Sequence, residues 1–64
     1  MTYDEKQTQA CNNVRNALLT IISQATEALD HIGSDKATDL LHEIFHERAA
    51  AVAWNNRIVN DDFS

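Results

Sequence analysis

Apolar side chains recur every three or four positions along both halves of the chain, and the only glycine separates the two halves. This spacing places residues on one side of an α-helix, in the pattern of a helix that packs on a second helix. Because Gly33-Ser34-Asp35 interrupts the pattern, we predict an all-α fold: one αα-hairpin domain over 1–64, with helices over about 3–32 and 35–59, a turn at 33–35 and a tail at 60–64. The first stripe consists of Cys11, Val14, Leu18, Ile21, Ala25, Ala28 and Ile32, and the second of Ala37, Leu40, Ile44, Glu47, Ala51, Trp54 and Ile58.

Folding the chain at this turn brings a large residue of one stripe opposite a small residue of the other in nearly every layer. Ile32 then lies opposite Ala37, and Leu18 lies opposite Ala51. Facing helices that alternate large and small side chains in this way fill the space between them without voids. Cys11 belongs to the first stripe, so we expect it to be a small buried hydrophobe rather than a reactive thiol.

Capping residues mark the ends of both predicted helices. Thr2 and Glu5 form a capping box, in which the hydroxyl and the carboxylate each accept a backbone N–H. Gly33 suits the left-handed conformation that ends a helix, and Ser34 then caps the second helix. Residues 60–64 carry no helical apolar pattern, and we expect them to be a frayed tail.

The apolar arc of each helix is wider than the arc that one neighbouring helix covers. Ile22 and Leu29 widen the first stripe on one flank, and Leu41, Phe45 and Val52 widen the second. A second copy of the hairpin is the most economical cover, which predicts a homodimer that forms an antiparallel four-helix bundle of coiled-coil type. The residues that we assign to the core or the dimer interface are Val14, Leu18, Ile21, Ile22, Leu29, Leu40, Leu41, Ile44, Phe45, Val52, Trp54 and Ile58.

Two polar residues, Arg48 and Asn55, interrupt the apolar arc of the second helix near its centre. A polar residue at such a position sets the register of packed helices or forms hydrogen bonds across a subunit interface. The alternative interpretation is that these two residues belong to a functional site.

Charge and composition restrict the classes of partner. The net charge of −5 argues against nonspecific binding to duplex DNA, which requires clustered lysine and arginine. No stretch approaches the ~18 apolar residues of a membrane span. The polar, acidic start of the chain fits neither a signal peptide nor a basic targeting segment. We therefore expect a soluble cytoplasmic protein that does not bind membranes.

One segment resembles a catalytic motif. His42-Glu43-Ile44-Phe45-His46 matches HExxH, in which two histidines bind Zn²⁺ and the glutamate acts as general base. A helical wheel places both histidines opposite the apolar side, in solvent, whereas a catalytic metal needs a walled cleft and a third ligand. We predict no catalytic residue, no metal and no cofactor, and keep a zinc-dependent hydrolase as a second alternative.

Amide side chains cluster in the middle of the first helix. Asn12, Asn13 and Asn16, with Arg15 among them, have lower helix propensity than alanine, glutamate or lysine at the same positions. One interpretation is a tolerated solvated surface. The other is a polar surface that binds a partner, and we take these four residues as the candidate partner-binding site.

Several segments resemble the Rop family of plasmid-encoded αα-hairpins. They are Met1-Thr2 with Glu5-Lys6, Leu19-Thr20-Ile21-Ile22, Glu27-Ala28-Leu29-Asp30, and more loosely Asp35 to Asp39 with His42. This resemblance implies an antiparallel four-helix dimer that binds paired RNA stem-loops. The helix face that the family uses for RNA carries lysines, asparagine, glutamine and an exposed phenylalanine. Here it holds Lys6, Arg15 and the amides.

The amide cluster and the predicted dimer together suggest a function. We expect a small, non-enzymatic, homodimeric regulatory protein that binds a macromolecular partner, either a protein or structured RNA. The Rop-like binding of RNA stem-loops is the first alternative.

Overall fold

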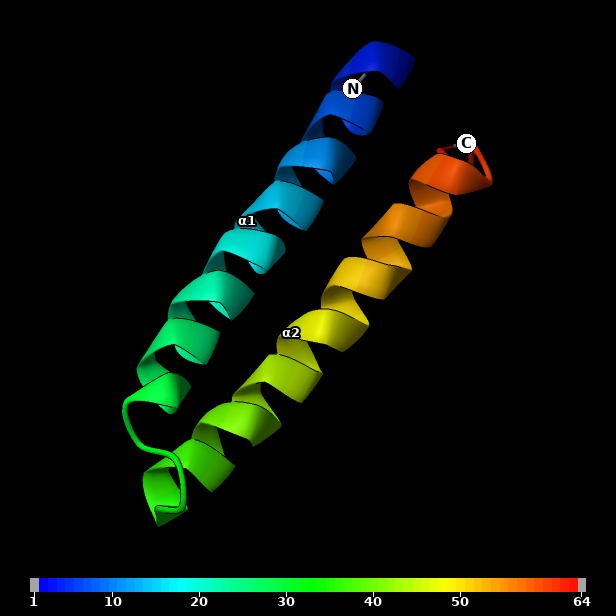
Figure 1. The fold of residues 1–64 in the computed structure, drawn as a ribbon. Helices are drawn as coiled ribbons and strands as arrows, with labels where there is room; N and C mark the ends of the chain where they lie inside the picture. Colours follow the sequence, from blue (N-terminus) through cyan, green and yellow to red (C-terminus); the bar gives the residue numbers. More distant parts are fainter. Residues whose placement is uncertain (1, 64) are drawn as a thin grey trace.

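The computed structural model describes residues 2–63 as two long antiparallel helices joined by a short turn (Figure 1). Helix α1 spans Tyr3–Leu29 and helix α2 spans Asp35–Val59, with no strand among the described residues. The hairpin measures 46 × 15 × 14 Å, and each helix has the other as its one neighbouring helix among the described residues. The predicted all-α hairpin is confirmed. Met1 and Ser64, which belong to the predicted N-terminal motif and tail, lie outside the described residues.

The predicted caps start both helices. The Thr2 hydroxyl accepts the Glu5 backbone N–H at 3.2 Å, and the Ser34 hydroxyl accepts the Ala37 backbone N–H at 3.3 Å. Gly33 has φ +86°, the left-handed conformation that glycine adopts without a Cβ clash. Within residues 2–63 the Glu5 carboxylate does not return a bond to the Thr2 N–H, so only half of the predicted capping box forms.

Helix α1 ends at Leu29, three residues before the predicted end at 32. The backbone N–H of Asp30 donates to the Glu27 carbonyl, and that of His31 donates to the Ala28 carbonyl, at 3.1 and 3.0 Å. These bonds span three residues rather than four, which tightens the chain at the helix end. The turn therefore occupies 30–34 instead of 33–35.

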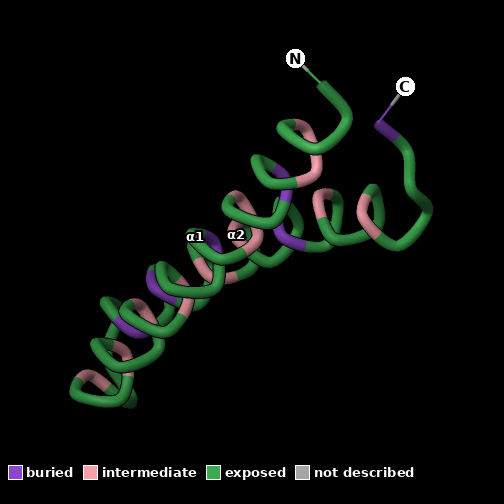
Figure 2. The backbone as a smooth tube through the Cα atoms, turned by 90° about the horizontal axis from the view of Figure 1, so that it is seen from above, coloured by how far each residue is buried: buried purple, intermediate pink, exposed green. Residues whose placement is uncertain are grey.

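The side of α1 that packs on α2 differs from the predicted stripe. Cys11, Leu18, Ala25 and Ile32 are exposed in the single hairpin, so the expected burial of Cys11 is wrong. The contact instead uses a stripe rotated by part of a turn, in which Ala10 and Ala17 are buried. Buried segments recur at intervals along the helices, while most of the backbone is exposed (Figure 2). Alanines at the contact let the two backbones approach closely. The rotated stripe consists of Ala10, Val14, Ala17, Ile21, Gln24, Ala28 and His31, which are buried or half-buried.

Helix α2 packs with the predicted stripe. Ala37, Leu40 and Ala51 are buried, and Ile44 and Ile58 are half-buried. Trp54 and Glu47 are also half-buried, at the edge of the contact. The sequence therefore predicted the contact side of α2 correctly, whereas the predicted contact side of α1 is rotated about the helix axis from the observed one.

The C-terminal segment folds back over the start of α1, so its expected fraying is wrong. Phe63 is only 5% exposed and contacts Tyr3 edge to face, with the ring centroids 5.8 Å apart. The Lys6 ammonium donates to the Phe63 carbonyl at 3.0 Å, and the Tyr3 hydroxyl donates to the Asp61 carboxylate. Asp61 reverses the chain with φ +55°. We call these four residues the C-terminal clasp.

Candidate functional site

The hairpin leaves a long apolar surface uncovered along one side. We call this surface the apolar face. Its eight large side chains are between 44% and 78% exposed, whereas a soluble monomer seldom exposes a continuous apolar patch of this kind. The members are Leu18, Ile22, Ala25 and Leu29 of α1, Ile32 of the turn, and Leu41, Phe45, Val52 and Val59 of α2.

Two grooves between the helices open on the apolar face. The groove near the turn has a volume of about 390 Å³ and is lined by apolar residues that include Leu29, Ile32 and Leu41. The other has a volume of about 420 Å³ and is lined by Leu18 and Val52 among others. Both helices contribute to each groove, so the apolar flanks that the wheel predicted on each helix form one surface.

Arg48 and Asn55 lie in this second groove, together with Asn56. Arg48 is exposed and forms no ion pair within residues 2–63. No carboxylate lines the groove among the described residues. Within residues 2–63, a positive charge therefore lies in the middle of the apolar face without a carboxylate beside it.

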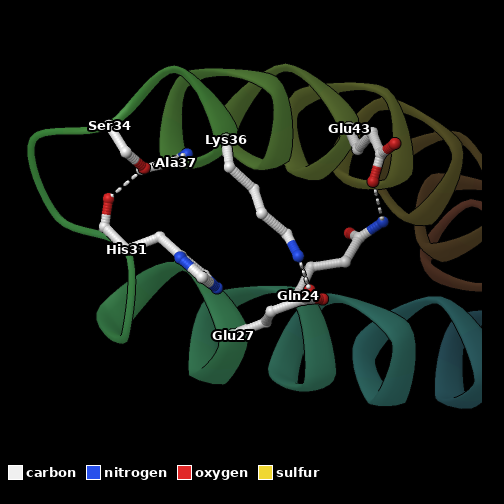
Figure 3. Close-up of polar contacts among 7 residues, drawn as sticks. All are labelled: Gln24, Glu27, His31, Ser34, Lys36, Ala37 and Glu43. Atoms are coloured by element: carbon white, nitrogen blue, oxygen red, sulfur yellow. Dashed lines mark hydrogen bonds and ion pairs between the residues drawn. The ribbon is translucent and has the colours of Figure 1, made fainter.

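Interhelical polar contacts lie on a different side of the hairpin (Figure 3). The Lys36 ammonium lies 2.9 Å from the Glu27 carboxylate, and the Gln24 side-chain amide donates to the Glu43 carboxylate at 3.3 Å. The hydrogen bond and the charge of Lys36 lower the pKa of Glu27. The side-chain oxygen of Gln24 is buried without a hydrogen-bond partner within residues 2–63. These contacts cross between the helices near the turn.

A groove lined by polar residues lies farther from the turn. Its α2 residue Glu47 is four positions after Glu43, so the groove is on the same side of α2 as the Gln24–Glu43 contact. It has a volume of about 310 Å³ and is lined by Asn13, Asn16 and Thr20 of α1 and by Glu47 and Trp54 of α2. We call this site the polar groove. Ala17 and Ala50 complete its lining.

The four predicted partner-binding residues are divided between two places. Asn13 and Asn16 line the polar groove, whereas the Arg15 guanidinium donates to the Asn12 side chain at 3.2 Å elsewhere on α1. Both Asn12 and Arg15 are exposed. The structure therefore keeps only half of the predicted cluster together.

Sequence reasoning missed the contribution of α2 to this groove. It placed both Glu47 and Trp54 in the stripe that packs on the first helix and assigned Trp54 to the core or the dimer interface. Both residues are half-buried and lie beside the asparagines. Glu47 and Trp54 are seven positions apart, which places them on the same side of α2, and this spacing could have identified them as neighbours in one groove.

The two histidines of the HExxH segment line none of the three grooves described above. His42 and His46 are exposed, as the helical wheel predicted, and His46 contacts the Phe45 ring edge to face at 6.0 Å. Within residues 2–63 no three histidine, cysteine or acidic side chains converge in a way that would hold a metal ion. The third histidine, His31, is half-buried in the turn, where its carbonyl accepts the Ser34 hydroxyl at 2.5 Å.

Comparison with known proteins gives no relative from which a site could be transferred. The sequence matches no protein-family model, and no curated protein or solved structure matches it significantly. Neither helix within residues 2–63 has the length and apolar character needed to cross a bilayer. The candidate sites therefore rest on the geometry of the hairpin itself.

Proposed function

We propose that this protein is a small, non-enzymatic interaction or regulatory protein that works as a homodimer. The apolar face is the observation that supports this proposal most directly. Two hairpins that pair through these faces form an antiparallel four-helix bundle, which buries the large apolar side chains that one hairpin leaves exposed.

The size of the apolar face fits such a dimer. The hairpin is 46 Å long and 15 Å wide, so one side offers an area close to the ~800 Å² that each partner buries in a stable interface. Because the described chain carries exposed leucine, isoleucine, valine and phenylalanine on that side, burial there supplies the driving force for association.

Two adjacent leucines provide a matched test. Leu18 lies in a groove of the apolar face, whereas Leu19 is 58% exposed and lines neither groove of that face. We expect sedimentation equilibrium to give about twice the chain mass of 7.2 kDa for the unmodified protein. Leu18→Asp abolishes the dimer because it buries an unpaired charge, and Leu19→Asp leaves the dimer intact. A folded monomer, or equal effects of the two substitutions, contradicts the dimer.

The polar groove supports a role in binding a macromolecule. It combines an aromatic ring with amide and hydroxyl groups, and it lies away from the apolar face, so dimerisation leaves it open. Each dimer then presents two such grooves. We propose the groove as the site at which the bundle contacts its partner.

Recognition of RNA stem-loops is the second candidate. Trp54 can stack on an unpaired base, and the Asn13 and Asn16 amides can bond base edges or 2′-hydroxyls. A gel-shift experiment with paired RNA stem-loops over a series of salt concentrations tests it. Absence of a complex at low salt rejects RNA as the partner, because phosphate contacts are strongest there.

A further inference from the structure

Glu47 is the charged residue in the lining of the polar groove. It is half-buried, yet within residues 2–63 it forms neither an ion pair nor a hydrogen bond. The other carboxylates at the helix–helix boundary have partners, since Glu43 accepts from Gln24 and Glu27 pairs with Lys36. The carboxylate oxygens of Glu47 still reach water, since the Gln24 side-chain oxygen is the buried polar atom without a partner within residues 2–63. The Glu47 carboxylate is therefore accessible from the groove and free to accept hydrogen bonds from a bound group.

Trp54 lies two helical turns from Glu47, about 10 Å along the axis of α2. The Arg57 guanidinium stands 4.9 Å from the centre of the Trp54 ring system. This contact places a cation on the indole within the protein itself, in the geometry of a cation–π interaction. The protein's own Arg57 therefore already supplies the cation at the indole, and a bound segment would contact the part of Trp54 that lines the groove.

The surface between Glu47 and Trp54 is small and mostly neutral. Ala17 and Ala50 leave room there, and the Thr20 hydroxyl donates to the Asn16 backbone carbonyl at 2.9 Å. An extended aliphatic chain fits against alanine methyl groups, and the amide oxygens of the asparagines accept hydrogen bonds from a donor-rich group.

We propose that the polar groove binds an arginine-bearing, basic segment of a partner protein. The guanidinium pairs with the Glu47 carboxylate, and an uncharged part of the segment lies against the part of Trp54 that lines the groove. An arginine presents a planar set of donors that matches a carboxylate in a bidentate pair. This inference rests on the proposed function as an interaction protein and specifies the chemistry of its partner.

Charge favours this partner over a nucleic acid. The chain has a net charge of −5, and Glu43 and Glu47 are both on the side of α2 that borders the groove. An acidic protein attracts basic segments over long distances and repels phosphate. A phosphate backbone in the groove would have to approach Glu47 directly.

Trp54 is the only tryptophan of the chain, so its fluorescence reports occupancy of the groove. The probe is a capped peptide of three arginines separated by glycines, and the lysine counterpart is the comparison. We expect a saturable change in Trp54 emission with the arginine peptide and weaker binding of the lysine peptide. Glu47→Gln should weaken binding roughly tenfold, because it removes a charge-assisted pair but keeps the side-chain shape.

Glu5→Gln is the matched control, since it removes the same charge from an exposed position about 12 Å or more along α1 from the groove. Its binding should equal that of the unmodified protein. Equal weakening by both substitutions, or no saturable change with the arginine peptide, overturns the inference. So does tighter binding of an RNA stem-loop than of the arginine peptide to the unmodified protein, because the groove then prefers phosphate.

Sedimentation of the same samples separates this inference from the dimer. If the protein is a dimer and its Trp54 emission does not change when the arginine peptide is added, the basic partner is rejected and the four-helix bundle is retained. A monomer rejects the bundle, whatever the peptide does.

Discussion

Tyr3 and Phe63 come from opposite ends of the described chain and meet in the C-terminal clasp. The ring of Phe63 is shielded by Tyr3, while the Tyr3 hydroxyl donates to Asp61. A lone aromatic residue after the end of a helix has no periodic neighbours, so no sequence pattern distinguished Phe63 from a disordered tail. The left-handed φ of Asp61, which no glycine marks, was equally invisible in the sequence.

The clasp makes stability sensitive to alkaline pH. The hydrogen bond to Asp61, followed by desolvation, raises the pKa of Tyr3 above its ordinary value of 10.0. Because the folded pKa lies above the unfolded one, the contribution to stability is fully present below pH 10 and is lost as the pH rises through the folded value. We expect the melting temperature to fall as the pH rises above 10.0, the ordinary pKa of tyrosine.

Tyr3→Phe is the corresponding variant, since it keeps the ring contact with Phe63 and removes the titrating hydroxyl. Its melting temperature should be lower than that of the unmodified protein at neutral pH, and the difference should vanish at high pH. Parallel pH profiles of the two proteins would show that the Tyr3–Asp61 bond does not stabilise the fold.

At the scale of the helices, the contact side of α1 was the part that sequence could not determine. Two stripes with the same spacing overlap on α1 and share Val14, Ile21 and Ala28. The predicted stripe adds Cys11 and Leu18, and the observed stripe adds Ala10 and Ala17. Hydrophobicity alone favours the predicted stripe, because its residues are larger. In the hairpin the alanine stripe makes the intramolecular contact, because small residues permit close approach. The stripe on α2, the caps and Gly33 followed from local signals.

The asparagines of the polar groove should cost α1 stability. Asn13→Ala with Asn16→Ala exchanges poor helix formers for the best one, worth about 0.5 kcal/mol at each position. For a domain of this size we expect the melting temperature to rise by a few degrees, measured by circular dichroism. The same double variant should weaken binding of the arginine peptide. Unchanged peptide binding would move the recognition surface away from Asn13 and Asn16.

The histidines of α2 should contribute little to folding. His42 and His46 are exposed, so replacing both by alanine should change the free energy of unfolding by no more than about 0.5 kcal/mol. Zinc analysis of untagged protein provides a second readout. Stoichiometric zinc that disappears in the double variant would restore the metal-binding interpretation of HExxH.

At the scale of the whole molecule, Arg48 is the residue that should weaken the proposed dimer most. It lies near the middle of α2, so in either two-fold pairing of full-length faces it comes to the same level as its own copy. No carboxylate of the described chain lines that groove. Arg48→Met keeps an apolar stem of similar length and removes the charge, and we expect it to strengthen the dimer by about 1 kcal/mol.

Dilution series analysed by sedimentation measure this change. A weaker dimer in Arg48→Met would mean that Arg48 finds an acceptor across the interface, and its role would then be to fix the register of the two hairpins. Arg48→Lys, which keeps the charge without the planar donors, distinguishes a specific acceptor from simple repulsion.

The clasp also brings residues 2 and 63 of the hairpin to the same end, opposite the turn (Figure 1). A short flexible linker between those two positions would close the chain into a ring, and the ring could be reopened in the exposed turn beside Gly33. Such a circular permutant would run α2 before α1 and still present both faces unchanged. The order of the helices in the chain is thus separable from the surfaces they build, and a tandem fusion of two permuted hairpins becomes a route to a single-chain bundle.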